Sequence, residues 1–447
     1  MVVDLLEWAL AAERGPRVDS ERVALLWPGG SCTYAELNRS VDERARALTA
    51  EGVDSGAVRP VAAGNDVDGV VELLATWRCG ATVAPLNPKL TRAEADGAHV
   101  ALARVATEAQ VILWTSGTAG VRRGVALSFD NLFANTSAVS DRLGSSADDV
   151  WLASLSIAHV GGLALVARAL MTGAAVFTAG AFDVEVVSDV IDGHGPAAPH
   201  PVTHASFVPT QLLRILDHRA EGPPSSFRCA LIGGAHAPAD LVTRALDAGW
   251  PISLSYGMTE MTSQVATAPP AQVRAKPGAL GKPLDCVELK IDEGGEIFLR
   301  GRSRAIAYVG SDEALADTDG WYRTGDFGYV DDVGDLWVTG RRIDRIVSGG
   351  VTVDAVEVED VLCMHPAVAE ACVVGVSDAE WGEVVGACIV PVEGEFDFDA
   401  VDELLRERLS AAKRPRLWCI EKELPLNANG KVERARVKAL LDLGRSL

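Results

Sequence analysis

The stretch CALIGGAHAPADLVTRALDAGWPISLSYG, residues 229–257, contains an apolar run, a helical pattern and a second apolar run in succession. The first run ends in Gly233 and Gly234, and the second ends beside Tyr256. Strands that alternate with helices predict a parallel sheet with crossover helices. Ligands gather at the carboxyl ends of such strands. We therefore expect a binding site where these two runs end.

The same alternation recurs toward the N-terminus, at residues 70–87, 161–180 and 205–216. Nearer the N-terminus, Thr33 and Glu36 have the spacing of a capping box and predict a helix that ends before Gly52. We predict an α/β fold in which residues 1–340 form a large N-terminal domain of parallel-rich sheets.

The pattern changes from about residue 280 to short, turn-rich strands such as GEIFLRG, residues 295–301. These strands predict a β-rich subdomain of the large domain. A boundary follows near TGRRIDRIVSGG, residues 339–350. Beyond it we expect residues 341–447 to form a small α+β C-terminal domain.

Composition and charge exclude several classes of protein. Of the 447 residues, 48% are hydrophobic, and no apolar run approaches the length of a membrane span. A formal net charge of −21 disfavours nucleic acid and anionic membranes as partners. The N-terminus has no basic region of the signal-peptide type, so we predict a cytoplasmic protein. The sequence leaves its oligomeric state open, a homo-oligomer included.

Residue usage adds two further expectations. Only eight of the 41 basic residues are lysines, which suits a surface hydrated in concentrated salt, while codon bias is the alternative explanation for scarce lysine. The eight cysteines include no CxxC pair, which argues against a zinc site and against a disulfide framework.

Glycines and hydroxyl residues crowd the stretch WTSGTAGVRRGVALS, residues 114–128. Glycines allow the backbone to approach a ligand closely, and hydroxyl and basic groups suit a phosphate chain. The spacing is not that of a P-loop NTPase, and an ordinary surface loop is the alternative. The candidate phosphate-binding residues are Thr115, Ser116, Gly117, Thr118, Gly120 and Arg123.

Five stretches together, in this order, resemble the signature motifs of the adenylate-forming superfamily of acyl-CoA ligases, luciferases and peptide-synthetase adenylation domains. They are TSGTAGVRRGV (115–125), SYGMTE (255–260), GEIFLRG (295–301), WYRTGDFGYVDDVGDLWVTGRRIDRI (321–346) and LPLNANGK (424–431). The resemblance extends from about residue 111 to 437 and implies that the small C-terminal domain is mobile. It also implies two half-reactions, in which a carboxylate attacks MgATP to give an acyl-adenylate and a thiol such as coenzyme A then displaces AMP.

The resemblance assigns roles to residues of the second and fourth motifs. It implies that Tyr256 stacks on adenine beside Gly233 and Gly234, that Thr259 contacts phosphate, and that Glu260 binds Mg²⁺, an ion that prefers hard oxygen ligands. Asp326 is similar to the acid that accepts both ribose hydroxyls, and Arg341 to the base that meets ribose or phosphate. Arg123 stands where the superfamily usually has lysine, which keeps the charge and alters the geometry.

The last motif and the hinge motif carry the remaining implied roles. Lys431 matches the adenylation lysine, a cation that orients the carboxylate and stabilises charge on the α-phosphate. Gly349 and Gly350 could line a path for the pantetheine of coenzyme A or simply form a hairpin turn. The position two after Arg341 is commonly charged in the superfamily and is Ile343 here, so the pivot could lie at a neighbouring residue.

Within the superfamily, the short chain and the stretch SYGMTEMTSQVAT resemble the 2-succinylbenzoate–CoA ligases of menaquinone synthesis. His159 matches a histidine at the acyl pocket and is expected as a pocket wall rather than a base. Ser263, Gln264 and Thr267 are candidates to hold the second carboxylate of such a substrate. The alternatives are a fatty- or aryl-acid CoA ligase, an adenylation protein that loads a carrier domain, and a non-catalytic nucleotide-binding relative.

Overall fold

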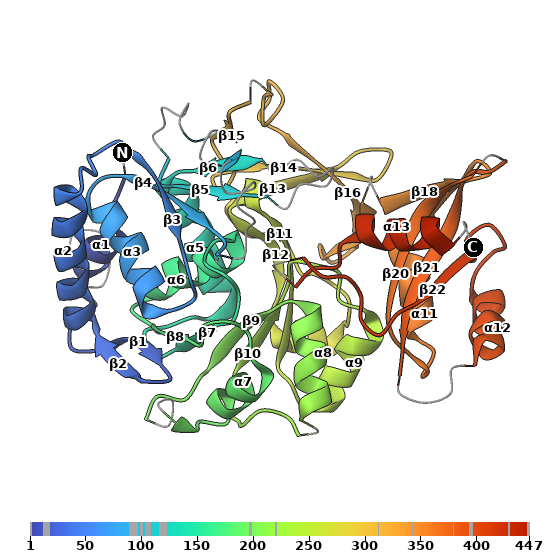
Figure 1. Cartoon of the computed structure of the whole chain (residues 1–447), viewed down its shortest axis with the longest axis horizontal. Helices are drawn as coiled ribbons and strands as arrows, with labels where there is room; N and C mark the ends of the chain where they lie inside the picture. Colours follow the sequence, from blue (N-terminus) through green and yellow to red (C-terminus); the bar gives the residue numbers. More distant parts are fainter. Residues whose placement is uncertain are drawn as a thin grey trace. The chain divides into compact units, whose positions relative to one another are not determined.

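The structure is a computed structural model that describes residues 2–11, 18–88, 97–98, 102, 109–115, 123–195, 199–219, 221–311, 313–341, 344–378, 380–392, 397–427 and 430–444. The chain divides into two compact units (Figure 1). The first contains residues 1–234, 245–289 and 299–322, and the second contains residues 235–244, 290–298 and 323–447. The predicted boundary between residues 340 and 341 stays a prediction.

The larger sheet of the first unit has the strand order β12-β11-β10-β9-β7-β8-β1-β2. Its inner strands, from β11 to β1, are parallel, and only the outer pairs are antiparallel. The strands are β1 (Val23–Trp27), β2 (Gly30–Thr33), β7 (Val150–Ala153), β8 (Ala175–Thr178), β9 (His204–Phe207), β10 (Cys229–Ile232), β11 (Ile252–Met258) and β12 (Ser263–Ala268). The prediction of a parallel-rich sheet is therefore confirmed.

A second sheet of this unit has the order β15-β6-β5-β4-β3. It mixes parallel pairs, β3 with β4 and β4 with β5, with the antiparallel hairpin of β5 and β6. The strands are β3 (Val58–Ala62), β4 (Thr82–Leu86), β5 (Val111–Trp114), β6 (Gly124–Leu127) and β15 (Ala307–Val309).

Helices of the first unit pack against these sheets and against one another. They are α1 (Leu5–Leu10), α2 (Tyr34–Ala50), α3 (Val67–Arg78), α5 (Phe129–Leu143), α6 (Val160–Thr172), α7 (Val184–Ile191), α8 (Pro209–His218) and α10 (Pro270–Ala275), while α9 (Ala239–Asp247) spans a point where the chain changes unit. Figure 1 shows α2 and α3 side by side, and α5 packs on α6. None of the described helices is long and apolar enough to cross a membrane.

The capping box predicted at the start of α2 is present. The Thr33 hydroxyl accepts from the Glu36 backbone N–H at 3.2 Å, and the Glu36 carboxylate accepts from the Thr33 N–H at 2.9 Å. The helix buries Leu37, Val41 and Leu48, among others, on one face. Local spacing therefore predicted both the start and the buried face of this helix.

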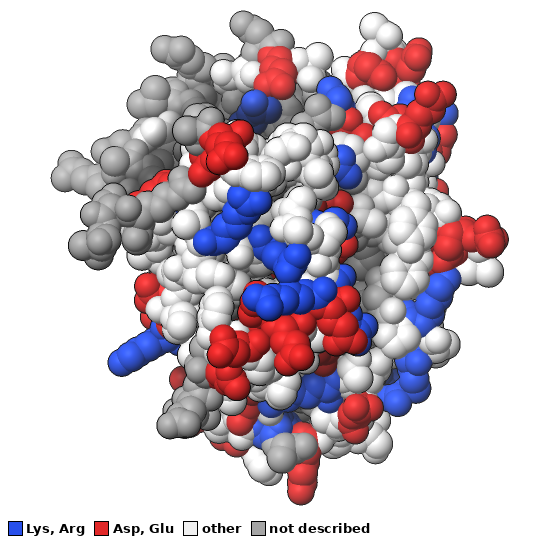
Figure 2. All heavy atoms as spheres, turned by 90° about the vertical axis from the view of Figure 1, so that its right-hand side faces the viewer, with Lys and Arg blue, Asp and Glu red and all other residues white. Residues whose placement is uncertain are grey.

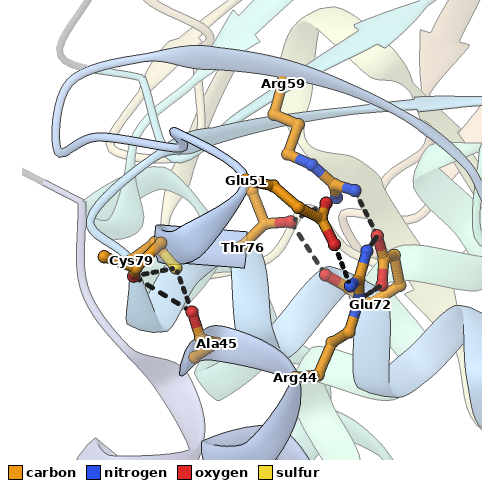
Figure 3. A network of polar contacts seen from close by, with 8 residues as sticks. Arg44, Ala45, Glu51, Arg59, Glu72, Thr76 and Cys79 are labelled. Atoms are coloured by element: carbon orange, nitrogen blue, oxygen red, sulfur yellow. Dashed lines mark hydrogen bonds and ion pairs between the residues drawn. The ribbon is translucent and has the colours of Figure 1, made fainter. Parts of the chain in front are cut away.

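A polar network ties α2 and α3 to β3 (Figure 3). The Glu72 carboxylate of α3 accepts from Arg44 of α2, with Nε to Oε2 at 2.6 Å, and also from Arg59 of β3. Arg59 donates in addition to the Thr76 hydroxyl, at 3.0 Å. The Arg44 guanidinium holds the pKa of Glu72 below its ordinary value, with Arg59 adding to the effect against partial burial. Three separate elements are therefore joined through one carboxylate.

The second unit contains most of a four-stranded sheet of order β13-β14-β16-β17, in which β16 and β17 are antiparallel. It also contains a separate sheet of order β19-β18-β21-β20, in which β22 pairs with β21 as well. The strands are β13 (Val287–Ile291), β14 (Glu296–Gly301), β16 (Tyr322–Val330), β17 (Leu336–Arg341), β18 (Arg345–Ser348), β19 (Val351–Asp354), β20 (Val368–Asp378), β21 (Gly382–Pro391) and β22 (Leu417–Ile420). Helices α11 (Ala355–Cys363), α12 (Phe398–Arg408) and α13 (Arg434–Gly444) complete it.

Two apolar clusters flank the strands β20 and β21 of the second unit. Helices α11 and α12 contribute to one cluster, and α13 contributes to the other. On the face shown in Figure 2, acidic and basic side chains lie in small interspersed groups. The net negative charge is therefore not gathered into one acidic patch on that face.

Candidate active site

The expected phosphate loop is closed at its base by the β5–β6 hairpin. The Thr115 backbone N–H donates to the Arg123 carbonyl at 2.9 Å, and the Arg123 N–H donates to the Thr115 hydroxyl at 3.4 Å. These two contacts fix the ends of the loop. The predicted residues within it, Ser116, Gly117, Thr118 and Gly120, lie outside the described residues.

A tyrosine connects this hairpin with the predicted magnesium ligand. The guanidinium of Arg123 lies 5.2 Å from the ring centroid of Tyr308, and the Tyr308 hydroxyl donates to Glu260 Oε1 at 3.2 Å. Strand β15 places Tyr308 opposite Val125 of β6, next to the hairpin. Arg123 also forms an ion pair with Glu313 at 3.1 Å. Arg123 and Glu260 therefore both contact the same tyrosine.

Tyr308 belongs to none of the sequence motifs. Burial raises the pKa of its hydroxyl, and the Glu260 carboxylate raises it further. The phenol is therefore a neutral hydrogen-bond donor to that carboxylate. Its position depends on the pairing of β15 with β6, two segments far apart in the sequence, and no local spacing signals that pairing.

Glu260 lies in a tight turn, Thr259–Met261, at the end of β11. The next two residues, Thr262 and Ser263, have φ of 58° and 106°, which is a costly backbone conformation for side chains of this kind. The turn is held by the Glu260 carbonyl, which accepts from the Ala305 N–H at 2.8 Å, and by the buried Thr262 hydroxyl, which donates to the Ser303 carbonyl at 2.6 Å. The surrounding backbone thus fixes the carboxylate-bearing residue.

Glycine at position 257 is required by the same turn. A Cβ atom there would lie 1.9 Å from the Ser263 carbonyl oxygen, so any side chain would push β11 and β12 apart. The glycine in the SYGMTE motif therefore has a packing reason as well as a place in the motif.

The predicted adenine residues lie at the carboxyl ends of neighbouring parallel strands. Gly233 follows β10 and donates its N–H to the Phe207 carbonyl of β9 at 3.1 Å. A Cβ at Gly233 would meet the Ser255 hydroxyl of β11 at 2.5 Å, and Gly234 has φ of 82°. Tyr256 is the next residue of β11. The structure thus brings Gly233, Gly234 and Tyr256 to one sheet edge, as the strand pattern predicts.

The predicted carboxylate anchors lie on β12, antiparallel to β11. Gln264 and Thr267 are buried, and the Thr267 hydroxyl donates to Gln264 Oε1 at 2.5 Å. Asn135 of α5 donates to the Gln264 carbonyl at 2.7 Å. This network orients the Gln264 amide so that its oxygen faces Thr267. Ser263 precedes it, paired with Met258 of β11.

His159 stands at the N-terminal cap of α6, where its carbonyl accepts from the Leu163 N–H at 2.9 Å. The following Gly162 packs closely, because a Cβ there would lie 2.3 Å from the Ser156 carbonyl oxygen. The sharp turn into α6 therefore sets the position of the half-buried histidine. Its expected role as a pocket wall stays a prediction.

In the second unit, Asp326 of β16 and Arg341 of β17 are cross-strand partners. Arg341 Nε lies 2.9 Å from Asp326 Oδ1, and the carboxylate is buried. The pair can present a carboxylate and a guanidinium together, which suits a ligand that bears both hydroxyl groups and phosphate.

Lys431 follows a tight turn in the same unit. The Asn427 N–H donates to the Lys431 carbonyl at 2.8 Å, and the Asn427 side chain accepts from the Lys431 N–H at 3.1 Å. Burial lowers the pKa of the Lys431 ammonium, and the positive charge of Arg341 lowers it further. The second unit therefore brings Lys431 into the electrostatic neighbourhood of the Asp326–Arg341 pair.

Gly349 and Gly350 connect β18 and β19 as a two-residue hairpin turn. Both have positive φ, 56° and 82°, and the flanking Ser348 and Val351 are paired. A Cβ at Gly349 would meet the Trp381 ring at 2.5 Å. The turn alone accounts for both glycines, and the coenzyme A path stays a prediction. The hinge residue Ile343 lies outside the described residues.

Among the described residues, no three His, Cys, Asp or Glu side chains are grouped as a metal site. A single carboxylate such as Glu260, oriented by Tyr308, fits an ion that is held mainly by the phosphates of its nucleotide. The described residues thus suit magnesium that arrives with ATP.

Two family models match the chain. Residues 12–98 and 99–309 match the AMP-binding enzyme family, and residues 357–431 match the AMP-binding enzyme C-terminal domain. A 2-succinylbenzoate–CoA ligase from Bacillus anthracis (strain A0248) is 33% identical over 470 aligned positions, which cover 94% of this chain and 96% of that protein. Another, from Bacillus thuringiensis subsp. konkukian (strain 97-27), is 37% identical, and the alignment covers 75% of this chain and 70% of that protein.

Solved structures resemble the whole chain. The o-succinylbenzoate CoA synthetase of Bacillus subtilis in complex with the acyl-adenylate intermediate OSB-AMP has a TM-score of 0.86 and 30% identity, with 98% of each chain covered. The same enzyme with ATP and magnesium ion has a TM-score of 0.84, covering 97% of this chain and 99% of that one. ATP-bound MatB from Rhodopseudomonas palustris has a TM-score of 0.86 at 25% identity, covering 98% and 99%. The fold is therefore shared by ATP-binding proteins with different names.

Proposed function

The chain belongs to the AMP-binding enzyme family of the adenylate-forming superfamily, and from that premise we propose that it is an AMP-forming 2-succinylbenzoate–CoA ligase of menaquinone biosynthesis. The observation that carries the proposal is the position of Gly233, Tyr256 and Glu260 at the carboxyl ends of the neighbouring strands β10 and β11. The relatives named for this activity at 33–37% identity support the choice of acid. In the first half-reaction, 2-succinylbenzoate displaces pyrophosphate from ATP. In the second, coenzyme A displaces AMP and forms the thioester.

In this proposal each described site residue has a defined task in the first half-reaction. Tyr256 and Gly233 bind the adenine, and Asp326 with Arg341 binds the ribose. Arg123 and Thr259 bind phosphate oxygens. The Lys431 ammonium orients the attacking carboxylate and stabilises charge on the α-phosphate.

Magnesium has a defined place in the same proposal. A bound Mg²⁺ would neutralise charge on the ATP phosphates. Glu260 would hold it, with the Tyr308 hydroxyl fixing the orientation of that carboxylate.

The dicarboxylate would be recognised on β12. Ser263, three residues after Glu260, has the strained backbone φ of 106°, and the Gln264 side chain is held by the Thr267 hydroxyl. A fixed polar pair discriminates against a substrate that lacks its partner group, because the pair would be left without a partner in a closed site. We expect an acid without the second carboxylate to be a poor substrate.

Pyrophosphate release with MgATP and a panel of acids tests the proposal. The panel contains 2-succinylbenzoate, benzoate and a fatty acid, each with and without coenzyme A, in dilute buffer and in molar KCl. We expect strong release with 2-succinylbenzoate, with AMP and the thioester formed when coenzyme A is present. Turnover of benzoate or the fatty acid, without turnover of 2-succinylbenzoate, would contradict the proposed substrate but agree with the proposed mechanism.

The remaining arms of this experiment address the other expectations. Transfer to a carrier protein but not to coenzyme A would identify an adenylation protein, and absence of pyrophosphate release with every acid would contradict an enzymatic role. Higher turnover in molar KCl is the result expected of a protein adapted to high salt. We also infer a cytoplasmic location, which fractionation of cells that contain the protein would test.

A further inference from the structure

Three cysteines lie in a row across the sheet of the second unit. Cys372 of β20 is the register partner of Cys388 of β21, and Cys388 is the register partner of Cys419 of β22. Register partners on neighbouring strands point to the same face of a sheet. All three belong to the apolar cluster to which α13 also contributes. The row is invisible in the linear sequence, where no two of these cysteines are close.

Two of the three thiols are in direct contact. Cys388 Sγ and Cys419 Sγ are 2.7 Å apart, while a covalent S–S bond is about 2.05 Å long. Neighbouring strands lie about 4.8 Å apart, which is within the range of Cα separations, about 4.4–6.8 Å, that a disulfide bridges. The bond therefore needs little movement of either strand.

Cys388 and Cys419 differ in their exposure and in their neighbours. Cys388 is fully buried, whereas Cys419 is partly exposed on β22 and lies 3.9 Å from Glu421 Oε1. Cys372 instead accepts from Arg434 Nη1 at 3.8 Å. Within the part of the chain that the structure describes, no cluster suits a metal ion, so these thiols are not explained as zinc ligands. An oxidant can reach Cys419 first, and the nearest partner is Cys388.

We propose that Cys388 and Cys419 form a reversible disulfide when the protein meets a peroxide. The Cys419 thiolate attacks one oxygen of hydrogen peroxide, the O–O bond breaks, and the products are a sulfenic acid and water after proton transfer. The Cys388 sulfur then attacks the sulfenic sulfur, the S–O bond breaks, and the hydroxyl leaves with the Cys388 proton as a second water. Two thiols are oxidised by two electrons and one peroxide is reduced to two waters.

The bond has a structural consequence for the segment that bears Lys431. Residues 421–430 connect β22 to Lys431, and α13 begins at Arg434. A disulfide fixes β22 to β21 and so removes freedom from the start of this segment. Burial raises the pKa of both thiols, Cys388 and Cys419, so the reaction is expected to be slow at neutral pH and faster as pH rises. The proposal is independent of the acid that the enzyme activates.

Thiol counting on the full-length protein tests the proposal. The folded protein is treated with hydrogen peroxide, excess peroxide is removed, and free thiols are alkylated in denaturant before intact mass and peptide mapping. We expect two fewer alkyl groups than on the eight cysteines of the untreated protein, and one cross-linked peptide pair that contains Cys388 and Cys419. The cross-link should raise the midpoint of thermal unfolding. A thiol reductant should restore all eight alkylation sites and return the midpoint to that of the untreated protein.

Matched variants make the test specific. Cys419→Ser should abolish the cross-link, and because Cys419 is partly exposed this variant is expected to fold. Cys286→Ser, in the first unit, should leave the cross-link unchanged. A bridge from Cys372, oxidation of Cys419 to sulfinic acid without a bridge, or retention of all eight thiols would overturn the proposal.

Discussion

Arg123 in the first unit and Lys431 in the second are two cations that the motifs assign to the phosphates, and their surroundings differ. The Arg123 side chain is 48% exposed and already forms an ion pair with Glu313. Lys431 is partly buried, and both that burial and the charge of Arg341 lower its pKa. A guanidinium stays ionised at any pH the protein survives, whereas a desolvated ammonium does not. The first cation is permanent, and the second depends on pH.

The largest expected effect comes from removing the second cation. Lys431→Ala should slow pyrophosphate release by about 10²–10³-fold, the loss typical of one preorganised electrostatic group. The rate from a presynthesised acyl-adenylate with coenzyme A should change little, because that step does not need the cation. Lys422→Ala, an exposed lysine of the same segment, is the control. Equal losses in both half-reactions would contradict the assigned role.

The pH profile tests the same difference without removing the charge. The Lys431 ammonium is charged below its pKa, and that pKa is lowered. The rate of pyrophosphate release should therefore decrease as pH rises, and the decrease should begin at a lower pH than the titration of an ordinary lysine. Lys431→Arg should move this fall to higher pH, even at a reduced maximal rate. If the rate of the Lys431→Arg variant decreased over the same pH range, another group would be responsible for the decrease.

A smaller effect is expected at the permanent cation. Arg123→Ala should raise the KM for ATP by about tenfold, the loss of roughly one charge-assisted hydrogen bond. Arg123→Lys should recover most of that loss, and Glu313→Gln should not weaken ATP binding, because it removes a competitor for the guanidinium. If Arg123→Ala instead reduces kcat as strongly as Lys431→Ala, the two cations are not distinct in the way we describe.

Tyr308 tests whether the first cation and the magnesium ligand are linked. Tyr308→Phe keeps the ring beneath Arg123 and removes the hydroxyl that donates to Glu260. The magnesium concentration for half-maximal pyrophosphate release should rise about fivefold, the value of one net hydrogen bond. Tyr329→Phe, at an exposed tyrosine of β16, should leave it unchanged. No change in Tyr308→Phe would remove Tyr308 from the site.

The smallest effect on activity is expected at the Arg44–Glu72–Arg59 network. Glu72→Gln should lower the free energy of unfolding by about 1–3 kcal/mol at neutral pH and leave KM and kcat unchanged. Because the pKa of Glu72 is lowered in the fold, its contribution is present above the unfolded pKa and is lost as pH falls through the folded pKa. Chemical denaturation of both proteins at several pH values measures this. Glu51→Gln should change stability less, and a loss of activity in Glu72→Gln would show a link to the site.

The sequence predicted what depends on local spacing. The capping box of Thr33 and Glu36, the parallel-rich sheet and the edge that gathers Gly233 and Tyr256 all follow from periodicity and from short motifs. The family follows from motif order. The short chain and the stretch SYGMTEMTSQVAT already favoured a 2-succinylbenzoate–CoA ligase, and the relatives that align with most of the chain carry that name.

What the sequence could not predict depends on pairing between distant segments. Tyr308 reaches Glu260 only because β15 pairs with β6, and Cys388 meets Cys419 only because β21 pairs with β22. A strand register cannot be obtained from one strand alone, since a shift by one residue reverses every side chain. The roles of the individual site residues stay predictions that the variants above address.

Product analysis with 2-succinylbenzoate tests the central claim most directly. The full-length protein is incubated with MgATP, coenzyme A and 2-succinylbenzoate, and the products are identified and quantified by mass spectrometry. Our account predicts AMP, pyrophosphate and 2-succinylbenzoyl-CoA in equal amounts, with none of the three when the acid is omitted. AMP and pyrophosphate without the thioester, or no reaction with this acid while another acid is converted, would contradict it.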